Sequence, residues 1–244
     1  MKTRFPRILI ACPVRNREKI FPEYLDRLLT LKYPRDRVSF YFIVNNSEDR
    51  TEEILWEFAS RYEMFYEDVR IQRVTFDNLP ADNRSANVRM RLYSPLAVMR
   101  NMIRDWAITT GVDYIFSVDS DILLEPNHLQ QLLSHGKDCV AGLISNCPAT
   151  NRENLLYYNE ARDKFYRKDG NGGAFGQTGL IQVDLTGAIM LISRHAFLSG
   201  QWGEGLSGED EGFARYMRRA GIEMFVDCDC RPEHVMDVDN YVRR

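Results

Sequence analysis

Short apolar runs typical of β-strands alternate with segments of helical spacing, and this alternation limits the fold more than any other feature. The first half has strand patterns at residues 7–12, 38–44, 69–76 and 114–118. Helical patterns follow at residues 21–33, at 51–62, and from Ser94-Pro95 to Gly111. Strands that alternate with helices in this way predict an α/β fold with a mostly parallel central sheet, flanked by helices and connected by right-handed crossovers.

The second half continues the pattern with more polar sequence. We expect a short helix after Pro126, strands at 139–144, 181–184, 187–193 and 223–228, and a helix from Glu209 to Ala220 ended by Gly221. The glycine-rich residues 168–179 predict either a lid or a surface linker. We expect a single domain over residues 1–244, with a nucleotide-binding half at 1–125 and an acceptor-side half at 126–244.

Composition indicates a soluble globular protein. Hydrophobic residues make up 44% of the 244, the formal net charge is −3, and no apolar run is long enough for a transmembrane helix. This charge balance argues against nucleic acid as a partner. Five scattered cysteines and the lack of a signal-peptide core predict a reducing compartment, by default the cytoplasm. Cys228 and Cys230 with His234 lack the usual spacing of a zinc site.

Three polar segments follow predicted strands and should meet at one edge of the sheet. They are residues 13–17, 45–49 and 119–121. Ligands of parallel sheets bind beyond the carboxyl ends of the strands. Strand alternation would point Asp119 and Asp121 to the same side, where a hard divalent cation would relieve their repulsion and bind a diphosphate. The alternative is a solvated turn.

Several motifs, in order, resemble the family 2-like glycosyltransferases of the GT-A fold. The matching segments are ACPVRNRE at 11–18, IVNNSEDRT at 43–51, MRN at 99–101, YIFSVDSD at 114–121, LTGAIMLISR at 185–194 and GEDEGF at 208–213. The resemblance covers most of the chain. It implies a GT-A fold and metal-dependent transfer of a hexose from a UDP- or GDP-sugar to a hydroxyl, with Mn²⁺ or Mg²⁺ as cofactor.

The resemblance also implies roles for individual residues. Residues bordering the nucleotide would be Pro13, Arg15, Asn45, Asn46, Arg100, Asp119 and Ser120. The metal would be bound by Asp121, with Asp119 on the ribose or the metal and His234 as a third ligand. Asparagine at 45 and 46 replaces the family's usual aspartate, which would alter base preference because an amide both donates and accepts.

The resemblance implies that Asp210 is the catalytic base, with Glu209 beside it on the acceptor side. Gly212 replaces the family's second acid. The alternative for Glu209 and Asp210 is that they only stabilise a helix N-terminus. His234 could equally be a solvated or capped histidine, and His128, His135 and His195 are expected to be structural or exposed. Tyr157, Tyr158 and Trp202 could stack on a sugar acceptor or pack in the core.

The predicted function is therefore an inverting glycosyltransferase acting on a glycan or another hydroxyl acceptor. One alternative is a sugar-phosphate nucleotidyltransferase, although the loop at 13–17 lacks the glycines that such enzymes carry after their first strand. A catalytically inactive nucleotide-sugar-binding module is the other alternative. A retaining outcome also stays open.

Overall fold

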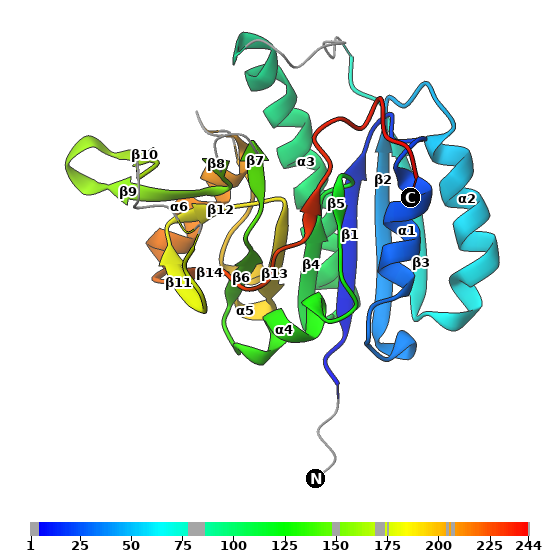
Figure 1. Ribbon diagram of the computed structural model, residues 1–244, viewed down its shortest axis with the longest axis horizontal. Coiled ribbons are helices and arrows are strands. Elements are labelled where there is room, and N and C mark those ends of the chain that lie inside the picture. Colours follow the sequence, from blue (N-terminus) through cyan, green and yellow to red (C-terminus); the bar gives the residue numbers. More distant parts are fainter. Residues whose placement is uncertain are drawn as a thin grey trace.

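The computed structural model describes residues 5–77, 86–147, 152–168, 174, 176–203, 205 and 208–243. Its central sheet contains the strands β1 (Ile8–Val14), β2 (Val38–Asn45), β3 (Asp68–Val74), β4 (Tyr114–Val118), β6 (Cys139–Gly142), β11 (Leu180–Val183), β13 (Ile189–Ser193) and β14 (Met224–Asp227). The strand order is β11-β14-β6-β13-β4-β1-β2-β3. β4, the strand that leads into Asp119, therefore lies inside the sheet (Figure 1).

The pairing of the strands is mostly parallel in the first half and mixed in the second. β1 pairs in parallel with both β2 and β4, β2 with β3, and β14 with β6. β13 is antiparallel to both of its neighbours, β4 and β6, and β11 is antiparallel to β14. The expected mostly parallel sheet is confirmed, with its antiparallel strands in the second half.

The α-helices of the described residues cover the sheet: α1 (Phe21–Leu29), α2 (Thr51–Tyr62), α3 (Ala86–Thr110), α4 (His128–Ser134), α5 (Arg194–Ser199) and α6 (Glu209–Ala220). Short 3-10 helices are η1 (Arg35–Arg37), η2 (Glu63–Phe65) and η3 (Glu160–Arg162). The apolar residues of α1, α2 and α4 pack in one buried cluster, and those of α3, α5 and α6 in another. The helices thus form two layers, one on each face of the sheet (Figure 1).

Alternation along β4 shows how the sequence builds both layers. Ile115 lies in the cluster with α3, whereas Phe116 and Val118 lie in the cluster with α1. The inner strands, such as β1 and β2, are buried on both faces, which is why they appear as continuous apolar runs, whereas the edge strand β3 is only partly buried. Ser117 faces the α3 side with Ile115, and this is the side on which a polar network begins.

Smaller strand pairs surround the far end of the sheet. They are β9 (Leu155–Asn159) with β10 (Lys164–Tyr166) and β12 (Leu185–Thr186), β5 (Ile122–Leu123) with β15 (Glu233–His234), and β7 (Ser145–Cys147) with β8 (Arg152–Glu153). β9 and β10 form an arm that projects from the side of the molecule (Figure 1). No strand was predicted here, because the tyrosine-rich sequence of the arm hides its alternation.

Two other expectations differ from the structure. α3 begins at Ala86 and contains Pro95 in its interior, so Ser94 and Pro95 are not its start. Met90 and Leu92 have good helix propensity, so the helix continues through a proline that removes only one backbone donor. A further short strand, β15, follows the strand expected to be last.

Half of the glycine-rich loop expected at 168–179, residues 169–173 and 175, lies outside the described residues. Within the part of the chain that the structure describes, no helix is long and apolar enough to cross a membrane.

Candidate active site

The loops after β1 and β2 are locked together at the carboxyl edge of the sheet. The amide of Asn16 donates to Ser47 Oγ at 3.1 Å, and the amide of Glu48 donates to Asn16 Oδ1 at 2.9 Å. The Arg17 amide donates to Thr51 Oγ1 at 2.7 Å. Asn16 adopts a positive φ of 49°, which asparagine tolerates better than most residues. These contacts bring the first two polar segments together, as predicted.

Arg17 joins this loop pair to the segment after β4. Its Nε donates to Ser120 Oγ at 3.2 Å, and its Nη2 lies 3.9 Å from Asp121 Oδ2. The convergence of all three polar segments is therefore confirmed. Arg17 was not singled out from the sequence. Its position was a usable signal, since neighbouring carboxylates need a cation and this basic loop was expected at the same sheet edge as the two acids.

Asp119 and Asp121 have different partners. The strand ends at Val118, and the amide of Ile122 donates to the Asp119 carbonyl at 3.0 Å, which closes a turn. The alternation of a strand therefore does not extend over the two acids, and the prediction that it directs them to one side was wrong. Asp119 Oδ1 accepts from Arg100, whereas the Asp121 carboxylate lies between Arg17 and His234.

Asp121 and His234 form a pair suited to a hard divalent cation. His234 Nε2 lies 3.9 Å from Asp121 Oδ1, while His234 Nδ1 is 3.0 Å from the Ser145 carbonyl. Because a carbonyl only accepts, Nδ1 carries the proton, and the Nε2 of a neutral ring offers its lone pair to the Asp121 side. Burial, together with the charge of Asp119, raises the pKa of Asp121, so a bound cation would relieve the site.

These two residues fit a cation that takes its remaining ligands from substrate phosphates and water, as Mn²⁺ and Mg²⁺ do. Among the described residues, no three His, Cys, Asp or Glu side chains form a complete metal site. Asp119, the other acid predicted to bind the metal, is hydrogen-bonded to Arg100. Cys228 and Cys230 are buried free thiols whose pKa is raised by that burial.

Arg100 connects the segment after β4 to the N-terminus of α6. Its Nη1 donates to Ser117 Oγ at 2.8 Å, its Nη2 to Asp119 Oδ1 at 2.9 Å and its Nε to Glu209 Oε1 at 2.9 Å. Burial alone would lower the pKa of Arg100, but Asp119, Asp210 and Glu209 raise it well above its usual value. The arginine was predicted to contact the nucleotide, and in this structure its three nitrogens are bound to the protein itself.

Asp210 is held in the first turn of α6 by a tryptophan. Trp202 Nε1 lies 3.3 Å from Asp210 Oδ1, and the Trp202 ring stacks on Phe213 with centroids 4.5 Å apart. Asn101 fixes the Trp202 backbone, since it accepts from the Trp202 amide at 2.8 Å and donates to its carbonyl at 2.9 Å. Trp202 is 3% exposed, so it is a core residue that supports Asp210.

The surroundings of Asp210 favour its protonated form. Burial and the neighbouring Glu209 raise the pKa of Asp210 to about 8, although Arg100 opposes this shift. A carboxylate with a pKa near the working pH is a stronger base than a solvated one. Glu209 and Asp210 also lie at a helix N-terminus, so the alternative role of stabilising α6 operates alongside this geometry.

Two glycines are required by the way α6 packs. A Cβ on Gly187 would lie 2.0 Å from Asp210 Oδ2, and a Cβ on Gly212 would lie 2.5 Å from the backbone of Gly203. No side chain fits at Gly212, which explains why this chain has glycine where the resembling enzymes carry a second acid. Asn154 supports the same region by donating to the Gly187 carbonyl at 2.9 Å. The sequence analysis predicted neither the close approach at Gly187 nor the one at Gly212.

The remaining predicted residues border the same edge. Pro13 lies opposite Ile43, one residue before the end of β1, and the Arg15 carbonyl accepts from Arg17. Asn45 is the buried last residue of β2. Asn46 has both side-chain amide atoms bound to the Phe76 backbone at 3.0 Å, so it joins the ends of β2 and β3.

The other aromatic and histidine residues have structural contacts. Tyr158 lies under the Arg218 guanidinium at 3.9 Å, and Tyr157 under the Lys168 ammonium at 3.6 Å. His128 Nδ1 accepts from the Glu125 amide, His135 pairs with Asp227 at 2.8 Å, and the exposed His195 lies near Asp138. The three histidines are structural or exposed, as predicted.

Comparison with solved structures gives the fold. A mannosyltransferase from Pyrobaculum calidifontis, in complex with GDP-mannose and Mn²⁺, superimposes with a TM-score of 0.60 at 16% identity, covering 96% of this chain and 58% of that one. GalNAc-T7 with UDP, GalNAc and Mn²⁺ gives 0.65 at 12% identity, covering 96% and 44%. The fold is that of the GT-A glycosyltransferases.

Comparison of sequences gives the family. The chain belongs to the Anp1 family, whose model matches residues 2–161. It is 30% identical over 145 residues to procollagen galactosyltransferase 1-A of Xenopus laevis, covering 59% of this chain and 24% of that protein. It is 28% identical over 200 residues to a glycosyltransferase 25 family member of Anopheles gambiae, covering 78% and 32%. The chain thus spans about a third or less of the length of these relatives.

Proposed function

We propose that this chain transfers a hexose from a UDP- or GDP-sugar to an acceptor hydroxyl with inversion, and that it requires Mn²⁺ or Mg²⁺. The observation that carries the proposal is the Arg100 bridge. One guanidinium holds both Asp119, beside the Asp121–His234 pair, and Glu209, beside Asp210. Arg100 thus links the neighbour of the proposed cation ligand to the neighbour of the proposed base, which supports assigning both to one site.

The donor would bind with its diphosphate at Asp121 and His234. A bound cation supplies positive charge that stabilises the leaving diphosphate. Arg17 lies beside Asp121 with a side chain 27% exposed, so its guanidinium can contact a phosphate from the other side. The nucleoside would lie along the locked loops, near Pro13, Arg15, Asn45 and Asn46.

Asp210 would act as the base. Its carboxylate takes the proton of the acceptor hydroxyl, the acceptor oxygen forms a bond to the anomeric carbon, and the bond from that carbon to the diphosphate oxygen breaks with its electron pair leaving on the diphosphate. A single displacement of this kind inverts the anomeric centre. Trp202 and Gly187 support the proposal because they orient the carboxylate without neutralising it.

Similar proteins support the choice of donor and acceptor classes. The structural neighbours were solved with GDP-mannose or UDP and with Mn²⁺, which favours a UDP- or GDP-sugar with a divalent cation. A relative named for galactosyl transfer to procollagen supports a glycan or glycosylated protein as acceptor.

The free cysteines of the described residues are consistent with a reducing compartment.

The proposal is tested by incubating the protein with Mn²⁺ and a panel of UDP- and GDP-sugars, with and without simple glycoside acceptors. Release of the nucleoside diphosphate is expected, and anomeric NMR of the product should show inversion. Asp121→Ala should abolish cation-dependent donor binding, while the exposed Asp36→Ala serves as a charge-matched control. Release of pyrophosphate would indicate a nucleotidyltransferase instead, and donor binding without any turnover would indicate an inactive binding module.

A further inference from the structure

The chain leaves the candidate cation site as an irregular segment that returns to α1. We call residues 235–243 the C-terminal strap. It begins where the Val235 amide donates to the Asp121 carbonyl at 2.9 Å. From there it runs in front of the sheet and reaches α1 (Figure 1). One end of the strap is thus hydrogen-bonded to the backbone of the metal-binding acid.

His234 is held by a short strand and by its neighbour Val235, which is 9% exposed and packs in the core. His234 lies in β15, a strand of only two residues that pairs with β5, and its ring is bound to the Ser145 carbonyl. An isolated pair of such short strands has little stability in water. The core packing of Val235 fixes His234 on one side, and the attachment of the rest of the strap adds to that restraint.

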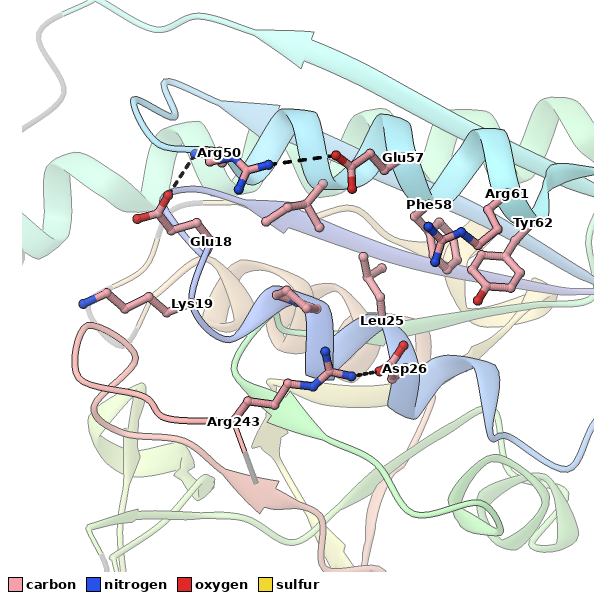
Figure 2. Close-up of a pocket in the computed structure, with 12 residues that line it drawn as sticks. Glu18, Lys19, Leu25, Asp26, Arg50, Glu57, Phe58, Arg61, Tyr62 and Arg243 are labelled. Carbon is pink, nitrogen blue, oxygen red and sulfur yellow. Dashed lines mark hydrogen bonds and ion pairs between the residues drawn. The ribbon is translucent and has the colours of Figure 1, made fainter.

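The strap is held on α1 by side-chain contacts. Tyr241 Oη donates to Glu23 Oε2, and Glu23 is 7% exposed. Arg243 pairs with Asp26 one turn further along α1, at a groove of about 570 Å³ between α1 and α2 (Figure 2). Lys19 Nζ donates to the Asp239 carbonyl at the start of α1.

These anchors differ in strength. A hydrogen bond to a buried carboxylate is charge-assisted and is not screened by water. The Arg243 and Asp26 side chains are each about half exposed, so their pair contributes little. The Tyr241 hydroxyl is therefore the strongest of these polar anchors, and Val235 and Val238 add apolar contacts with the core.

We infer that Tyr241 is a positioning residue for the cation site: its hydrogen bond to Glu23 holds the strap on α1 and so keeps His234 beside Asp121. This inference rests on the proposed cation-dependent function. When the strap detaches, His234 leaves Asp121, and molecules in that state lose cation affinity. The apparent affinity for the cation therefore follows the fraction of molecules in which the strap is attached.

The test is a titration of free Mn²⁺ by electron paramagnetic resonance, in the presence of UDP and, separately, of GDP. Tyr241→Phe keeps the ring but removes the hydroxyl, and we expect it to weaken Mn²⁺ binding by about three- to tenfold. Arg243→Ala should change the affinity by less than about twofold. Val242→Ala is the matched control, because this neighbouring side chain is 79% exposed, and it should bind as the wild type does.

A double-mutant cycle separates positioning from a general structural effect. In a His234→Ala background, Tyr241→Phe should cause no further loss of Mn²⁺ affinity, because the group it positions is gone. Hydrogen exchange should be faster in the strap of Tyr241→Phe and unchanged in β1 and β4. If Tyr241→Phe does not fold, Glu23→Gln replaces it, since it removes the charge and retains an acceptor.

The outcomes are distinguishable. Wild-type protein that binds no Mn²⁺ with either nucleotide would overturn the proposed cation dependence and this inference with it. Wild-type binding combined with an unchanged Tyr241→Phe, or an equal loss in the His234→Ala background, would overturn the inference alone.

Discussion

Trp202 Nε1 lies 3.3 Å from Asp210 Oδ1 and orients the candidate base from a position buried in the core. This hydrogen bond lowers the pKa of Asp210, against the larger effects of burial and of Glu209 that raise it. The indole is itself fixed by Asn101 through its backbone and by Phe213 through its ring. Trp202 therefore packs in the core and supports the candidate base, and it does not present its ring for stacking on a sugar acceptor.

Removal of that hydrogen bond should shift the pH dependence of the reaction. In Trp202→Phe the stacking ring remains and the N–H is lost, so the pKa of Asp210 should rise further. We expect the rising limb of kcat/KM to move to higher pH and the rate at pH 7 to fall about threefold to thirtyfold. An unshifted pH profile would contradict the contact.

The wild-type pH profile should itself reflect the base. Because the pKa of Asp210 is raised to about 8 in the free protein and the base must be ionised, kcat/KM should increase with pH and level off above about pH 8. Asp210→Asn should remove this limb, lower kcat by about 10²- to 10⁴-fold and leave donor binding intact. Donor binding is checked by calorimetry on the same preparation.

The raised pKa of Asp210 also predicts a change in stability. The native state holds the Asp210 proton up to about pH 8, whereas the unfolded chain releases it near pH 4, so the native state binds more protons between these values. Stability should therefore fall as pH rises through this window, by at most about 1.4 kcal/mol per pH unit from this group. Urea unfolding of Asp210→Asn should lack this part of the slope.

Gly187 should not tolerate a methyl group. In Gly187→Ala the new Cβ would lie 2.0 Å from Asp210 Oδ2, so the carboxylate must move and kcat should fall about 10²-fold or more while the fold survives. Gly203→Ala is the matched control, since its Cβ would make an ordinary contact of 3.6 Å with Gly212. Equal effects of the two substitutions would rule out the specific role of Gly187.

Arg100 should be required for the fold as well as for the site. In Arg100→Ala two acids, Asp119 and the buried Glu209, lose their shared cation. Removing one partner of a buried ion pair costs about 3–5 kcal/mol, so we expect a loss of that order in the free energy of unfolding. Arg100→Ala combined with Glu209→Gln should recover part of it, as chemical denaturation would show.

Much of the fold follows from the sequence because strand and helix periodicity is local. The helices at 51–62 and 209–220 and the strand at 114–118 have the predicted bounds. The same alternation assigns apolar residues of each strand to the two helix layers. Pro95 is the exception. Proline is common at the first position of a helix, but here the helix propensity of the preceding residues lets α3 begin earlier, at Ala86.

The sequence by itself also determined that polar segments gather at the carboxyl edge, since parallel strands place their ends together. Only the tertiary structure decided which partner each polar group has. Arg100 bridges two acids far apart in the chain, His234 meets Asp121 through a two-residue strand, and Gly212 is fixed by the backbone of Gly203. Such contacts depend on the direction of side chains and on the close approach of packed elements. Neither produces a periodic pattern in the sequence.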